Sequence, residues 1–353
     1  HGVFREAVEL ELQAAEPGST LVYTTNGSPP SPTNGVAVPP PSAGVLASIR
    51  LPIADTTVVR AASFRDGFER SPSVTQTYVF ADRVARQPAR PAGLPIQWAD
   101  GSAADYEVDP DVVNRSLPGY GFTEALESLP ILSVVAAPTD LWDRNRGIYS
   151  NPLPRGDDWE RPVSAELIFP DGSPGFQVNC GAHIHGNISR QNDFTQKHSF
   201  RLVFRSRYGP SDLEFPLFGE TGVRQFDEVV VKGLSTDSWP VVEWGANGEG
   251  YVRWWRREAS YIRDQWVRDA YGDMGQIACR GRFVHLFLNG LYWGLYNLTE
   301  HPSSSFQAQH YGGRRDEYDA FKDFTELDSG NTEAWDTMMA LAGSGMSTLA
   351  AVQ

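Results

Sequence analysis

Short alternating runs separated by turn residues fill the first 80 residues, and this spacing is the feature that most limits the fold. The runs are VELELQ, TLVYTT, TTVVRAASF and VTQTYVF, and the segments between them include EPGS, NGSPPSPTNG and DGFERSPS. Runs of this length, divided by Gly, Pro, Asn and Ser, are typical of an antiparallel sandwich. We therefore predict an antiparallel, immunoglobulin-like β-sandwich over residues 1–82. One face of each strand is expected to be covered and the other to face water.

A Pro-rich stretch with weak patterning follows this first unit. Its central part reads QPARPAGLPIQWADGSAADYEVDPD, from Gln87 to Asp111. Proline and glycine at this density interrupt both helices and strands. We predict that residues 83–127 form a linker laid over a surface, closed by a short helix in FTEALESLP.

Strands and helices are mixed in the remaining region, residues 128–353. Its clearest element is FVHLFLNGLYWGLYNLT, where Asn289 and Gly290 occupy a two-residue turn between aromatic-rich arms, a strong hairpin pattern. Helical spacing of apolar residues from position 251 to 271 predicts the longest helix. A second helix is predicted from a cap at Asn331 or Thr332 to about Leu341. The pattern predicts an α+β region.

Charge and composition exclude some functions. Thirty Lys and Arg residues against 44 Asp and Glu give a net charge of −14, so a surface for nucleic acid would oppose the protein's own field. No run approaches the 18 or so apolar residues of a membrane span. The two cysteines, Cys180 and Cys279, allow one disulfide or two buried thiols.

Two sets of motifs resemble known families. YTTNGSPPSPTNG, followed by TTVVRAASFRDGFERSPSVTQTYVF, resembles the chitobiase/hexosaminidase C-terminal-type β-sandwich. From Leu129 to Phe324 the order of GIYSNP, GFQVNCGAHIHGNISR, KHSFRLVFRSRYG, FPLFG, YIRDQ, HLFLNGLYWGLYNLTEH and EYDAFK resembles the spore-coat-protein-H (CotH) kinase family. The resemblance implies an incomplete, atypical protein-kinase-like domain over residues 128–353.

By this resemblance, Lys197 in QKHSFRL is the candidate phosphate contact and Glu300, at the end of the hairpin, is the family glutamate. The family usually continues with Arg after that glutamate, whereas here His301, Pro302 and Ser303 follow. The resemblance also places three further residues on the nucleotide side: His185, Arg201 and Lys322. ATP with Mg²⁺ or Mn²⁺ is the expected cofactor set of a complete protein.

Several of these residues have a simpler interpretation. Lys197 is equally a solvated lysine before a strand, and Glu300 a surface carboxylate paired with Arg282 or Lys322. His183 and His185 share one face of a strand and allow a metal site, but the resemblance favours replacement of cleft-facing arginines. Five arginines form a basic stripe that Glu258, Asp264 and Asp269 are expected to pair on a wet face: Arg253, Arg256, Arg257, Arg263 and Arg268.

The resemblance implies an exported bacterial kinase, extracellular or at the cell surface, that acts on Ser of a secreted or surface protein. The family's later Asn/Asp and Trp-Asp motifs would follow Gln353, so residues 1–353 are expected to be inactive and to self-associate through the face left uncovered. The alternative is a non-catalytic binding or scaffold protein. A carbohydrate-associated function ranks third, because no pair of carboxylates indicates a glycosidase site.

Overall fold

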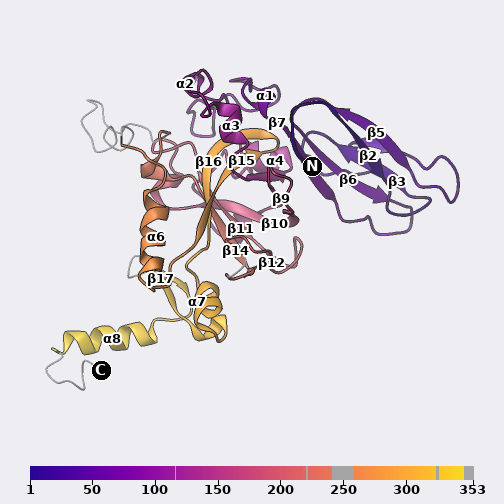
Figure 1. The fold of residues 1–353 in the computed structure, drawn as a ribbon. Helices are drawn as coiled ribbons and strands as arrows, with labels where there is room; N and C mark the ends of the chain where they lie inside the picture. Colours follow the sequence, from indigo (N-terminus) through magenta and orange to yellow (C-terminus); the bar gives the residue numbers. More distant parts are fainter. Residues whose placement is uncertain (116, 220–221, 241–257, 323–325, 346–353) are drawn as a thin grey trace.

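Two β-structures, a sandwich and a closed barrel, make up most of the protein in the computed structural model (Figure 1). The structure describes residues 1–115, 117–219, 222–240, 258–322 and 326–345. In these ranges the chain is mostly β, with short helices around the barrel. None of these helices is long and apolar enough to cross a membrane.

The N-terminal sandwich pairs a five-stranded sheet with a two-stranded one. The large sheet has the order β1 (Gly2–Phe4), β7 (Val74–Phe80), β6 (Thr57–Phe64), β3 (Thr20–Thr24) and β4 (Val36–Val38). The small sheet is β2 (Val8–Gln13) with β5 (Ser48–Ile53). Leu10, Leu51 and Val59 pack between the sheets. The sandwich is confirmed, but it is not purely antiparallel, because β1 pairs with β7 in parallel.

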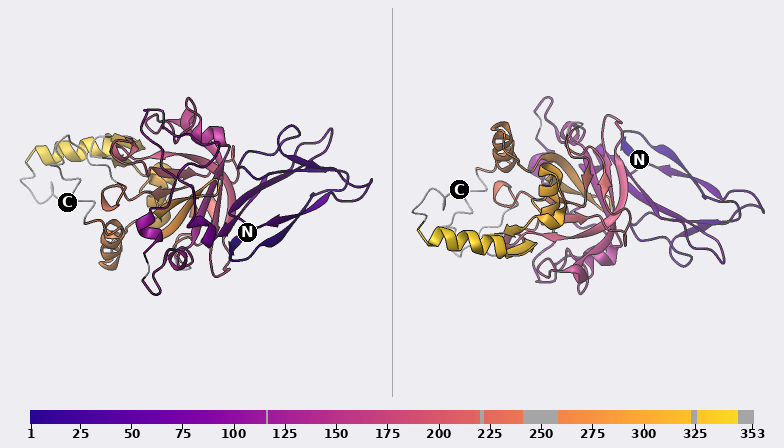
Figure 2. Two further views of the ribbon diagram at one scale, coloured as in Figure 1. Left: turned by 90° about the horizontal axis from the view of Figure 1, so that it is seen from above. Right: turned by 90° about the horizontal axis from the view of Figure 1, so that it is seen from below.

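The second face of the large sheet does not face water as predicted. Thr77 is fully buried: its N–H donates to Glu166 (2.8 Å) and its hydroxyl lies 2.7 Å from that of Ser133. Both partners belong to the barrel, which covers this part of the sheet, while the rest of the sandwich projects away from the barrel (Figure 2). Alternation identified the strands but could not reveal a second domain packed on the outer face.

Seven strands close the barrel in the order β10-β11-β14-β16-β15-β8-β9. Their bounds are β8 (Ile131–Ala136), β9 (Arg161–Ile168), β10 (Phe176–His185), β11 (Ser199–Val203), β14 (Glu228–Lys232), β15 (Gly281–Leu288) and β16 (Leu291–Thr299). Cys180 points into the barrel and Cys279 is half-buried, and both thiols are free. All ladders are antiparallel except that of β8 with β15.

The remaining elements are short. The helices are α1 (Ala81–Val84), α2 (Pro110–Val113), α3 (Phe122–Leu126), α4 (Pro138–Trp142), α6 (Arg263–Asp273), α7 (Ser304–Tyr311) and α8 (Glu333–Gly343). The single-turn helices are η1 (Asp157–Trp159), η2 (Ile188–Arg190), η3 (Ser235–Asp237) and η4 (Arg315–Glu317). Two small hairpins are β12 (Leu213–Glu214) with β13 (Gln225–Phe226), and β17 (Ala320–Lys322) with β18 (Glu326–Ser329). The C-terminal helix agrees with its prediction.

The stretch expected to be a linker contributes to the barrel core. Trp98 and Tyr106 are 4% and 2% exposed. The Trp98 ring centroid lies 5.3 Å from that of Tyr149, with the two rings tilted, and its indole N–H donates a hydrogen bond to Gln196 (3.0 Å). These contacts make residues 94–106 a cover for the aromatic end of the barrel. The division into independently folding units at residues 82 and 127 stays a prediction.

The predicted Asn-Gly hairpin is present as β15 and β16. Asn289 and Gly290 have φ of 49° and 82°, the left-handed conformation that this two-residue turn requires. The Asn289 side chain also holds β8: its Oδ1 accepts from the N–H of Ala136 (2.9 Å) and its Nδ2 donates to that residue's carbonyl (3.0 Å). The turn residue thus fixes the hairpin and the neighbouring strand together.

We expect Asn289→Ala to lower the free energy of unfolding by about 2 kcal/mol. The change removes two hydrogen bonds to Ala136 and puts a side chain with poor left-handed tolerance into the turn. Urea unfolding followed by fluorescence measures the loss, with Asn289→Gly as a control that keeps the turn but not the bonds. A midpoint unchanged by Asn289→Ala would contradict this role.

Candidate functional site

A pocket of about 460 Å³ lies beside the barrel, where the last residues of β10 and β14 and the first residue of β11 meet the start of α6. We call it the β14 pocket. Its lining includes four charged residues: Lys232 at the end of β14, Asp237 in η3, and Arg263 and Asp264 in α6. Figure 1 shows α6 running along the side of the barrel. Its size is in the range of small-molecule sites.

Lys232 and Asp264 form the central ion pair of this pocket. The Lys232 Nζ lies 2.8 Å from Oδ2 of Asp264, and Arg268 contacts the same oxygen at 2.8 Å. Burial alone would raise the pKa of Asp264, but the hydrogen bond and charge of Lys232, aided by Arg268, hold it below its usual value. A carboxylate therefore orients the lysine at the mouth of the pocket.

The loop after β14 approaches the neighbouring strand closely. A Cβ on Gly233 would lie 2.2 Å from the carbonyl oxygen of Lys197, so only glycine fits there. Leu234, Ser235 and Tyr261 have φ of 61°, 38° and 65°, unusual for residues other than glycine. Two of the four such residues in the described ranges, Leu234 and Ser235, thus line this pocket, and backbone strain of this kind is concentrated at functional sites.

Asp237 connects this loop to α6. Its carboxylate accepts hydrogen bonds from the backbone N–H groups of Ser260 (2.8 Å) and Arg263 (3.0 Å), and the Arg263 guanidinium lies 3.2 Å away. The side chain is buried. Asp237 therefore fixes the start of α6, which carries Asp264 to Lys232.

The helix predicted between residues 251 and 271 is present only from Arg263 onward, as α6; residues 258–262 are described and are not helical, and Arg253, Arg256 and Arg257 lie outside the described residues. The expected pairing of Asp264 with Arg268 is present. The wet face is confirmed for Arg263, Asp264 and Asp269, which are exposed. It is wrong for Arg268, which reaches Asn297 on the barrel (2.9 Å), whereas the apolar Trp266 is 66% exposed. Polar side chains on the outer surface of β14 and β16 attract the polar side of the helix.

Lys197 lies away from this pair. Its Nζ sits 4.4 Å above the ring of Trp293, in the aromatic end of the barrel. Burial lowers the pKa of Lys197 to about 8, and the charge of Asp105 offsets this only in part. Its side chain is therefore not the freely solvated lysine of the simpler interpretation.

Lys197→Met should change the pH dependence of stability. Because the pKa is about 8 in the folded protein and 10.5 without burial, the unfolded chain binds more protons between these values. The wild type should gain stability relative to Lys197→Met as the pH rises through this window. Thermal unfolding of both proteins at pH 7 and pH 10 measures the difference, and an identical shift in both would contradict a buried Lys197.

Glu300 is buried and engaged by residues that the sequence did not suggest. It accepts from the backbone N–H of Arg280 (2.7 Å), and its Oε1 lies 2.9 Å from the Arg280 guanidinium and 3.2 Å from Nε2 of His310. The predicted partners lie elsewhere: Arg282 is placed over the ring of Phe169, and Lys322 pairs with Asp328 in the β17–β18 hairpin. Glu300 and Lys197 are thus not paired with each other.

Arg201 and His301 meet in a polar cluster next to the pocket. The Arg201 guanidinium lies 2.6 Å from Nε2 of His301, whose Nδ1 lies 2.7 Å from Glu228. Burial would raise the pKa of Glu228, but His301 and Arg201 reverse this and lower it to about 2. The histidine that follows Glu300 therefore completes a charge cluster.

His183 and His185 lie on the same outer face of β10, as predicted, opposite Arg201 and Ser199 of β11. His185 lines the β14 pocket, and its ring is 5.6 Å from that of His301. Burial, with the charge of Arg201, lowers the pKa of both histidines. Within the described ranges no three His, Cys, Asp or Glu residues are grouped to hold a metal ion.

Sequence reasoning missed Lys232 and Asp264 as a pair. One signal was present: Lys232 ends the apolar run EVVVK directly before a glycine, so it marks the charged end of a buried strand. Nothing in the sequence showed that α6 would pack beside Lys232, because 31 residues lie between Lys232 and Asp264. A contact between segments so far apart in one chain leaves no local sequence pattern.

Comparison with known families agrees with both halves of the chain. Residues 182–340 match the family described as CotH kinase protein, and residues 10–78 match the one described as Fn3 associated. The second name differs from the chitobiase-type resemblance noted in the sequence. No curated protein matches the chain. Every residue that lines the β14 pocket lies inside the first match.

Proposed function

We propose that this chain, whose residues 182–340 match the CotH kinase family and whose residues 10–78 match the Fn3-associated family, belongs to an ATP-dependent kinase that phosphorylates Ser of a secreted or surface protein. The observation that carries the proposal is the Lys232–Asp264 pair in the β14 pocket. A lysine oriented by a carboxylate is the group that kinases use to hold the phosphates of ATP.

The pocket supplies two cations to a polyphosphate. Lys232 provides a compact positive charge whose position Asp264 fixes, and Arg263 provides a second one at the rim. Such groups stabilise the charge that spreads over the phosphoryl oxygens during transfer, and they need no rearrangement at that moment. Asp237 contributes indirectly, because it holds the start of α6.

The residues fit phosphate better than a divalent ion. The two carboxylates of the pocket are already engaged, Asp237 by Ser260 and Arg263, and Asp264 by Lys232 and Arg268. Mg²⁺ prefers several oxygen ligands that are free to coordinate it. The described residues therefore do not fit Mg²⁺ or Mn²⁺, and we derive no step through a metal ion.

The contacts of Lys197 and Glu300 differ from those that their family positions imply. Their family positions put them on the nucleotide side, whereas their contacts are Trp293 for the lysine and Arg280 with His310 for the glutamate. We assign the phosphate contact to Lys232 and regard Lys197 as the competing candidate. His185 lines the same pocket. Arg201 does not line it, but Arg201 contacts His301, whose ring packs against that of His185. Lys322 pairs with Asp328 and does not line this pocket, so we assign it no phosphate contact.

Phosphotransfer to a Ser-rich peptide tests the proposal. With radiolabelled ATP and either Mg²⁺ or Mn²⁺, a longer protein that carries these residues should label the peptide, and Lys232→Met should abolish the signal. Labelling that persists in Lys232→Met would refute the assigned site. An extracytoplasmic location and self-association remain further predictions, tested by fractionation and light scattering.

A non-catalytic platform is the second candidate. It is favoured by one observation: Asp237 and Asp264, the carboxylates of the pocket, are both neutralised by neighbouring cations. Such a protein would bind nucleotide or phosphate and transfer nothing. Binding without turnover in every protein that contains these residues would support this alternative over the kinase.

A further inference from the structure

The strand β2 has a free edge in the N-terminal sandwich. It pairs only with β5, and within the described ranges no strand pairs with its other side. The ladder continues beyond β2, where the N–H of Ala14 donates to Ala47 (2.8 Å). Since antiparallel pairs alternate, the backbone groups of Glu9, Glu11 and Gln13 point away from β5.

The neighbouring residue confirms this direction. Ala15, next in the same alternation, directs its N–H to the hydroxyl of Ser63 on β6 (3.1 Å) instead of to β5. Pro52 lies opposite Glu9 on β5. Proline has no backbone N–H to donate, so it fits a position where the two strands exchange no hydrogen bond. The backbone groups of three alternate residues, Glu9, Glu11 and Gln13, are therefore available to an added strand.

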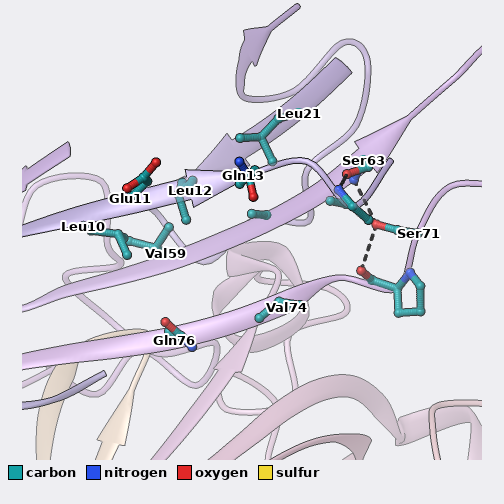
Figure 3. A pocket seen from close by; sticks show the side chains of 14 residues that line it. Leu10, Glu11, Leu12, Gln13, Leu21, Val59, Ser63, Ser71, Val74 and Gln76 are labelled. Carbon is teal, nitrogen blue, oxygen red and sulfur yellow. Dashed lines mark hydrogen bonds between the residues drawn. The ribbon is translucent and has the colours of Figure 1, made fainter. Parts of the chain in front are cut away.

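A hollow of about 290 Å³ lies along this edge, between β2 above and β6 and β7 below. We call it the β2 groove. Figure 3 shows Leu10 and Leu12 on the upper side of the hollow and Val74 and Gln76 on β7 along its lower side. Val74 is 53% exposed although it stands on the inner side of a sandwich. The small sheet is thus too narrow to cover the end of β7.

Charges beside the groove select its occupant. Glu9 and Glu11 lie on the outer side of β2, are 65% and 55% exposed, and share a single cation, Arg50. Two copies of β2 paired edge to edge would bring these acids together, and like charges across a ladder are destabilising. A basic strand would instead be attracted, by these acids and by the chain's net charge of −14.

We infer that the β2 groove binds an extended segment of another protein in which apolar and basic residues alternate. The segment adds a strand to β2: its backbone bonds the free groups of Glu9, Glu11 and Gln13, its apolar side chains cover Val74, and its basic side chains meet the two glutamates. This role is independent of the β14 pocket.

A labelled peptide of alternating Lys and Val, (Lys-Val)₄, tests the inference on the whole chain by fluorescence anisotropy. It should bind about tenfold more tightly than a peptide of the same composition in the order Lys₄Val₄. Glu11→Pro should remove that advantage, because it deletes a free N–H while the ladder to β5 keeps all its bonds. Glu11→Thr, which keeps the N–H, should lose affinity only through charge.

A second variant keeps the inference testable if Glu11→Pro fails to fold. Val74→Lys alters an exposed side chain, so the fold should tolerate it, and it should weaken the alternating peptide by about tenfold through charge repulsion. Equal binding of both peptides, or unchanged binding in both variants, would overturn the inference. A dimer of the chain that Glu11→Pro dissolves, detected by light scattering, would also overturn it, because the occupant would be a second copy.

Discussion

Replacement of Lys232 by Met should weaken ATP binding by at least about tenfold, since a hydrogen bond to a charged group contributes about 1.5–3 kcal/mol. The lysine amine is the oriented cation of the β14 pocket, and methionine has similar length without the charge. Arg268 still neutralises Asp264 in the variant, so the fold should be retained. Displacement of a fluorescent ATP analogue at constant ionic strength measures the effect.

Lys322→Met is the matched control, because it also removes one lysine charge but lies in the β17–β18 hairpin, paired with Asp328. Its affinity for ATP should equal that of the wild type. Equal losses in the two variants would mean that ATP responds only to overall charge. That result would remove the support for a specific phosphate contact at Lys232.

Trp98→Ala should lower the free energy of unfolding of the barrel by about 3–5 kcal/mol, the usual loss for a fully buried aromatic side chain. The indole ring packs against Tyr149, Tyr106 and Trp142 and donates to Gln196. Its removal would leave a cavity in the most aromatic part of the core. Chemical unfolding monitored by circular dichroism gives the value.

Tyr120→Ala is the control for this prediction. Tyr120 belongs to the same 83–127 segment but is 80% exposed, so its loss should change stability by less than about 0.5 kcal/mol. Similar, small losses of the free energy of unfolding in both variants would mean that residues 83–127 act as a linker, as the sequence predicted. A large loss only in Trp98→Ala would establish it as part of the barrel.

Local patterns were enough to predict the strands and the main hairpin. The Asn289-Gly290 turn follows from residues that accept positive φ, and alternating aromatics define its arms. The sandwich followed from regular strand and turn spacing. In each case the determining interactions lie within a few residues of one another.

Contacts between distant segments could not be predicted in this way. From the sequence alone, Thr77 is a polar strand residue expected to face water, but the barrel covers it. Trp98 is expected in a linker, but its ring packs against Tyr149. The pairing of Lys232 with Asp264 depends in the same way on how α6 returns to β14. The resemblance indicated the region of the chain that contains the β14 pocket, whereas only the packing indicated which lysine faces that pocket.

An acyl-phosphate derivative of ATP gives the most direct test of the central claim, since it transfers its acyl group to a lysine amine close to the bound phosphates. The chain has only three lysines, Lys197, Lys232 and Lys322, so peptide mass spectrometry can identify the modified one without ambiguity. Labelling at Lys232 that excess ATP suppresses is the predicted result. ATP-suppressed labelling at Lys197, with Lys232 unmodified, would contradict the assignment and place the phosphates at the aromatic end of the barrel.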